Sequence, residues 1–69
     1  MRRIERVNGW LRVPYDGSPN ASLKIQVNNE EPQRAFYDRD KMGGWAQIRS
    51  NSIGSITLYA SGNKLNTWQ

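Results

Sequence analysis

Two pairs of carboxylates are the residues of this 69-residue sequence whose types and spacing come closest to acid–base chemistry. The pairs are Glu30-Glu31, and Asp38 with Asp40. General acid–base catalysis needs a group whose pKa is held near neutrality, and histidine, the usual choice, is absent. The first pair lies in a polar link, and the second alternates with basic residues in a predicted hairpin turn. Solvation and local ion pairing account for both pairs, so we predict that the chain is not an enzyme.

The absence of cysteine and histidine also excludes the common zinc sites and any serine activated by a histidine. No nucleophile elbow, P-loop, dinucleotide fingerprint or calcium loop occurs in the sequence. We therefore expect neither a metal ion nor a cofactor. A chain without cysteine suits a reducing compartment, and it lacks the apolar run of about 7–15 residues of a signal peptide. We expect a cytoplasmic protein that does not associate with membranes.

The charge balance favours a polyanionic partner. Ten Lys and Arg residues outnumber six Asp and Glu residues, which gives a formal net charge of +4. On so small a surface this charge attracts nucleic acid or an acidic protein surface. A soluble basic protein without a charged ligand is the competing interpretation.

Apolar residues recur at every second position, which is the period of a strand with one buried face. Examples are Leu11-Val13-Tyr15, Leu23-Ile25-Val27 and Ile56-Leu58-Ala60. Turn sequences rich in Asn and Gly separate the apolar runs, and no helical stripe is present. The sequence predicts a single all-β domain over residues 1–69, with strands near 2–7, 10–15, 22–28, 34–38, 45–49, 53–60 and 64–68.

Strand alternation also predicts the core. Its members are the inward-facing apolar residues Ile4, Leu11, Val13, Tyr15, Leu23, Ile25, Val27, Phe36, Ile48, Ile56, Leu58 and Leu65. About a dozen such side chains fill a small closed barrel, and closure protects the sheet edges. A domain of this size buries only about 60% of its unfolded surface. A homodimer that completes the core is therefore an open alternative.

The two halves of the sequence echo each other. Gly9-Trp10-Leu11-Arg12-Val13 resembles the segment 44–48, which begins 35 positions later. Ser22-Leu23-Lys24-Ile25 resembles the segment 55–58, which begins 33 positions later. Duplication of a three-stranded meander and generic strand patterning both account for the echo. The fold is thus predicted as a small barrel or as two packed three-stranded meanders, with six or seven short strands.

Three short motifs, Leu11-Arg12-Val13, Gly17-Ser18-Pro19 and Gly44-Trp45, follow one another along the chain. Together they resemble the bacterial SH3-like domain, which opens with a Leu-x-Val strand and a Gly-Pro-Ser-type turn and later has a Gly-Trp strand. The resemblance implies a small SH3-like barrel. It also implies that peptides or cell-wall material are candidate ligands.

The aromatic residues indicate where a ligand could bind. If the alternating apolar residues face inward, Trp10 and Arg12 share the outer face of one strand, and Trp45 and Arg49 share that of another. An exposed indole can stack on a base while a neighbouring guanidinium meets phosphate. Structural packing of both indoles is the competing interpretation. The predicted ligand-binding residues are Trp10, Arg12, Trp45, Arg49, Arg2, Arg3, Arg6, Lys24 and Tyr59.

Three functions follow from this pattern, all of them non-catalytic. The first is nucleic-acid binding through the exposed Trp and Arg side chains. The second is a small inhibitor of the type that phages encode, which binds and blocks another protein and uses the same residues as interface anchors. The third is glycan or cell-wall binding, in which aromatic rings stack on sugars and affinity barely depends on salt.

Overall fold

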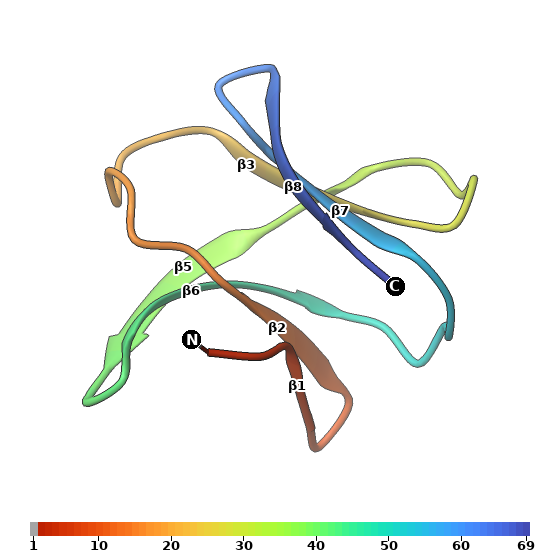
Figure 1. The fold of residues 1–69 in the computed structure, drawn as a ribbon, viewed down its shortest axis with the longest axis horizontal. Coiled ribbons are helices and arrows are strands. Elements are labelled where there is room, and N and C mark those ends of the chain that lie inside the picture. Colours follow the sequence, from red (N-terminus) through yellow and green to blue (C-terminus); the bar gives the residue numbers. More distant parts are fainter. Residues whose placement is uncertain (1) are drawn as a thin grey trace.

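The computed structural model describes residues 2–69, which form eight short strands joined by turns (Figure 1). All strand pairings are antiparallel. No helix long and apolar enough to cross a membrane occurs in this part of the chain. The prediction of an all-β chain is confirmed, and the arrangement is consistent with a small SH3-like fold. The strands are β1 (Glu5–Val7), β2 (Trp10–Pro14), β3 (Leu23–Val27), β4 (Gln33–Arg34), β5 (Phe36–Asp40), β6 (Gly43–Arg49), β7 (Ile56–Ala60) and β8 (Asn63–Trp68).

The strands form two four-stranded sheets. Sheet A has the order β1-β2-β6-β5, and sheet B has the order β4-β3-β7-β8. In Figure 1, β5 and β6 of sheet A run at an angle to β3, β7 and β8 of sheet B. The chain passes from sheet B to sheet A at Ala35, whose amide donates to the Leu23 carbonyl at 2.8 Å. This switch divides the predicted strand 34–38 into β4 and β5 and raises the strand count to eight.

An approximate two-fold axis relates the two halves of the chain. Each sheet takes two strands from each half, and its two central strands are equivalent in the repeat. At the centre of the β2–β6 pairing, Arg12 lies opposite Gln47, and at the centre of the β3–β7 pairing, Ile25 lies opposite Leu58. These partners are 35 and 33 positions apart, which are the two offsets of the sequence echo. The echo therefore corresponds to a structural repeat.

A single core cluster lies between the sheets. Its buried members include nine of the predicted core residues: Leu11, Val13, Tyr15, Leu23, Ile25, Val27, Ile48, Ile56 and Leu58. Ala35, Ala46 and Ala60 complete the cluster, and Ile4 is half-buried against it.

The prediction that Phe36 and Leu65 belong to the core is wrong. Phe36 is 58% exposed and Leu65 is 53% exposed. Phe36 begins β5 opposite Gln47 on the outer face of sheet A, because Ala35 has already taken the inward position. Leu65 falls at a register shift in the β7–β8 pairing, where it has no cross-strand partner. In both cases a local irregularity breaks the alternation on which the prediction depends.

Candidate functional site

Trp45 is fully buried on the outer face of sheet A, with 0% of its surface exposed. The guanidinium carbons of Arg2 and Arg12 lie 4.8 and 4.6 Å from the centre of its ring. Arg2 is held there because it donates to the Gly44 carbonyl at 2.6 Å and pairs with Asp16 at 2.7 Å. The prediction of an exposed indole at Trp45 is therefore wrong. Residues 2–4 fold back over sheet A and bring Arg2 onto the ring.

Arg12 is committed to three carboxylates. Its Nη2 lies 2.8 Å from Asp38 and 3.4 Å from Asp40, and its Nη1 lies 3.6 Å from Glu5. The Arg12 side chain is only 15% exposed. Because its charge is compensated and its surface is covered, Arg12 offers little to an anionic ligand, contrary to the predicted role.

The pKa values of two carboxyl groups near Trp45, those of Asp16 and Asp40, are lowered. The pKa of Asp16 lies below its ordinary 3.8 mainly because the Gly44 amide and the Arg2 guanidinium donate hydrogen bonds to it. The pKa of Asp40 is lowered first of all by the indole N–H of Trp45. That N–H makes no hydrogen bond of full geometry among residues 2–69, whereas the Met42 amide and the Arg12 guanidinium donate to Asp40 at 2.8 and 3.4 Å and also lower its pKa. Both carboxyl groups are thus held in their charged form.

These lowered pKa values predict acid sensitivity. A carboxyl whose pKa is lower in the folded state stabilises the fold above its unfolded value of 3.8, and the contribution is lost as the pH falls through the folded value. In thermal unfolding followed by circular dichroism, the Tm should stay level down to about pH 4 and fall below it. The double variant Asp16→Asn/Asp40→Asn should start lower and fall less. Superimposable profiles of the two proteins would show that these carboxylates do not stabilise the fold.

Trp10 and Arg49 are the accessible part of the predicted Trp and Arg surface. They lie opposite each other on β2 and β6, and the Arg49 guanidinium carbon is 4.3 Å from the centre of the Trp10 ring. Arg49 is exposed and also donates to the Asn8 carbonyl at 3.1 Å. The structure brings this pair together, but Arg49 already covers one face of the half-buried indole.

The other N-terminal arginines do not form a shared basic surface with Arg2. Arg6 donates to the Ser50 and Ser52 carbonyls, at 3.4 and 2.6 Å, in the loop after β6. Arg3 is exposed. The three predicted arginines thus serve different parts of the molecule.

The outer face of sheet B carries a row of basic and aromatic side chains that crosses all four strands. Arg34 lies opposite Lys24, Lys24 lies opposite Tyr59, and Tyr59 lies opposite Lys64. Directly opposed residues share a face of the sheet. With about 4.8 Å between neighbouring strands, the row is roughly 14 Å long. We call Arg34, Lys24, Tyr59 and Lys64 the basic row.

The cations of the basic row are exposed and uncompensated. Lys24, Arg34 and Lys64 are all exposed, and none of them takes part in an ion pair within residues 2–69. The four strands of sheet B contain no Asp or Glu. Their outward-facing charges therefore sum to +3. The strands of sheet A differ, because the charges of their outward-facing side chains sum to −1. The positive side chains are Arg12 and Arg49, and the negative ones are Glu5, Asp38 and Asp40.

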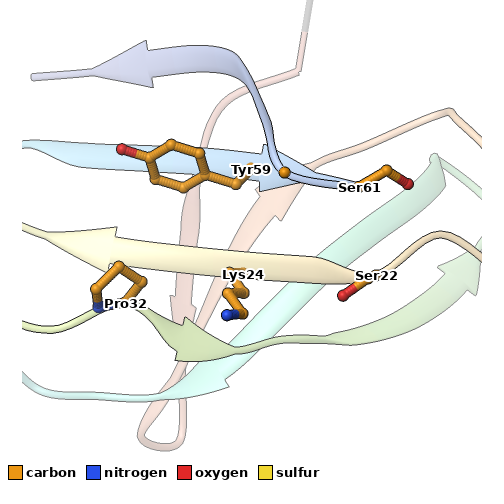
Figure 2. A pocket seen from close by; sticks show the side chains of 6 residues that line it. Ser22, Lys24, Pro32, Tyr59 and Ser61 are labelled. Atoms are coloured by element: carbon orange, nitrogen blue, oxygen red, sulfur yellow. The ribbon is translucent and has the colours of Figure 1, made fainter.

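A pocket opens beside Tyr59 on this face (Figure 2). It encloses about 340 Å³ and is lined by Ser22, Lys24, Pro32, Tyr59, Ser61 and Gly62. The Tyr59 hydroxyl donates to Gln26 Oε1 at 3.2 Å, which fixes the ring along the sheet. In Figure 2, Ser22 and Ser61 lie at one end of the pocket, while the rings of Tyr59 and Pro32 lie toward the other. The pocket thus combines ring surfaces with hydroxyl groups and one ammonium group.

Sequence reasoning found half of the basic row. Lys24 and Tyr59 were among the predicted residues, whereas Arg34 and Lys64 were missed. A compositional signal could have found Lys64: the strand segments 22–28, 53–60 and 64–68 contain no Asp or Glu, and the first and last of them contain Lys. No such signal marks Arg34, because the predicted strand 34–38 contains Asp38.

No protein-family model, curated protein or solved structure matches this chain. The resemblance to bacterial SH3-like domains therefore stays a prediction. Within residues 2–69, no group of three or more Asp, Glu, His or Cys side chains is arranged to hold a metal ion. The inference of function consequently depends on the surfaces described above.

Proposed function

We propose that this protein is a non-catalytic module that binds nucleic acid on the outer face of sheet B. The observation that carries the proposal is the basic row, in which three exposed cations flank one aromatic ring on a sheet face without carboxylates. Lys and Arg neutralise phosphates, and an aromatic ring on a sheet is a platform for base stacking. Both interactions are independent of base identity, so little sequence preference is expected.

The proposed ligand is the one predicted from the sequence, but the proposed binding site lies on sheet B and not on sheet A. The sequence favoured Trp10, Arg12, Trp45 and Arg49 on sheet A. Burial of Trp45, the three carboxylates around Arg12 and the stacking of Arg49 on Trp10 all weaken that surface as a nucleic-acid interface. Among the described residues, Lys24 and Tyr59 on sheet B have no comparable restraint apart from the Tyr59 hydroxyl bond.

Titration of a fluorescently labelled oligonucleotide, followed by anisotropy at several salt concentrations, tests the proposal. Each neutralised phosphate lowers the slope of log K against log salt by about 0.7–0.9, so three cations predict a slope near −2 to −3. The label must be on the oligonucleotide, because no tryptophan lies in the basic row. Trp10 and Trp45 belong to sheet A, and Trp68 on β8 packs against the core. Binding that does not change with salt, or no binding at low salt, would refute the proposal.

Blocking of another protein is a second candidate function, favoured by sheet A. Phe36 and Val7 are 58% and 45% exposed on its outer face, and Val7 lies opposite Trp10. Exposed aromatic and aliphatic side chains beside an arginine are typical interface anchors. The same titration separates the candidates, since a protein that acts only through sheet A gives no salt-dependent binding to oligonucleotides. If the protein binds glycans instead, its affinity for a glycan should hardly change with salt.

A further inference from the structure

We propose that the pocket beside Tyr59 takes one unpaired nucleobase, so that the ligand of the basic row is single-stranded where it crosses Tyr59. This inference rests on the proposed function and deepens it. The pocket volume of about 340 Å³ is near the lower end of the range of about 300–1,000 Å³ for small-molecule pockets. A pocket of this volume has room for one nucleobase.

The walls of the pocket suit the two kinds of surface that a base presents. The rings of Tyr59 and Pro32 and the carbon chain of Lys24 offer apolar surface to the flat face of a base. The Ser22 and Ser61 hydroxyls, at the other end, can hydrogen-bond to its polar edge. The cations of the basic row select a ligand with phosphates over a neutral sugar.

The position of Tyr59 excludes a paired base. The ring is half-buried and is fixed to Gln26 by its hydroxyl, so it cannot rise from the sheet to intercalate. In a duplex the faces of the bases are stacked on their neighbours, and a base must leave the stack before an outside ring can reach its face. A duplex would therefore meet the cations of the row but not use the pocket.

Within the described residues, the approximate two-fold repeat does not produce a second copy of this subsite. A shift of 33 positions relates the basic row to a second row on the same face, formed by Gln26 opposite Thr57 and Thr57 opposite Thr67. This second row has no aromatic ring and no cation, and its two threonine hydroxyls bond to each other at 3.3 Å. The repeated backbone thus carries the basic and aromatic side chains once, and we expect one stacked base per chain.

Three oligonucleotides of equal length test this inference: an intact single strand, the same strand with every base removed, and the duplex. Stacking of one base is worth about 1–3 kcal/mol, which corresponds to an affinity about 5–150-fold higher for the intact strand than for the abasic strand. Tyr59→Leu should lower the affinity of the intact strand by a similar factor and leave that of the abasic strand unchanged. Tyr59→Phe, which keeps the ring, should stay within about twofold of the wild type, and circular dichroism should show that all variants are folded.

The outcomes separate this inference from the proposed function. If all three ligands bind equally and with the same salt dependence, or if Tyr59→Leu weakens all of them alike, the base subsite is refuted and nucleic-acid binding stands. If none of the three ligands binds at low salt, the proposed function fails and the subsite with it. Loss confined to the intact strand supports the subsite.

Discussion

Replacing Trp45 with alanine should lower the free energy of unfolding by about 3–5 kcal/mol, the usual cost of removing a buried aromatic side chain. Trp45 is fully buried, and its ring also holds the guanidinium groups of Arg2 and Arg12. For a domain of this size, each kcal/mol lowers the Tm by about 4–8 °C, so a fall of roughly 12–40 °C is expected. Since the core of a domain of this size rarely supplies more than about 3–5 kcal/mol, the variant is expected to be close to unfolding at room temperature.

Trp10 provides a matched control for this substitution. It occupies the equivalent position in the other half of the repeat, but it is half-buried and stacks on a single guanidinium, that of Arg49. Trp10→Ala should therefore cost less than half as much as Trp45→Ala in urea denaturation. Equal costs for the two variants would mean that Trp45 is not the buried, arginine-covered residue that the structure shows.

The two tryptophans also show what strand alternation can and cannot predict. The two-residue period correctly places Trp45 on the outer face of its strand, because Ala46 and Ile48 face the core. Burial, however, depends on what lies above that face. Arg2 comes from the other end of the chain and is fixed by Asp16, in a loop. No periodicity specifies such a long-range cover.

The binding surface could not be predicted in full either, because alternation does not specify how strands pair. Alternation places Lys24 and Tyr59 on the outer faces of their strands, but it does not show which strands are neighbours. Only the pairing of β4, β3, β7 and β8 aligns Arg34 and Lys64 with them in one row. The sequence echo was the one signal with long-range information, since its offsets match the residues that pair at the centre of each sheet.

Neutralising the basic row should cause a large loss of binding. In the triple variant Lys24→Gln/Arg34→Gln/Lys64→Gln, three phosphate contacts are lost. At about 0.7 per contact for a single strand, the slope of log K against log salt should become less negative by about 2. The same relation predicts an affinity roughly 100-fold lower at about 0.1 M salt. These side chains are exposed and form no ion pair within residues 2–69, so the Tm should hardly change.

The most direct test of nucleic-acid binding by sheet B compares this triple variant with a second one of equal charge. Arg3→Gln/Arg39→Gln/Lys41→Gln also removes three exposed cations, so both variants fall from a net charge of +4 to +1. The measurement is the salt dependence of oligonucleotide affinity for the wild type and the two variants. We predict that only the first variant loses about 2 from the slope, and that the control stays close to the wild type. Equal losses in both variants would show that overall charge, and not the basic row, attracts the ligand, and would contradict the proposed site.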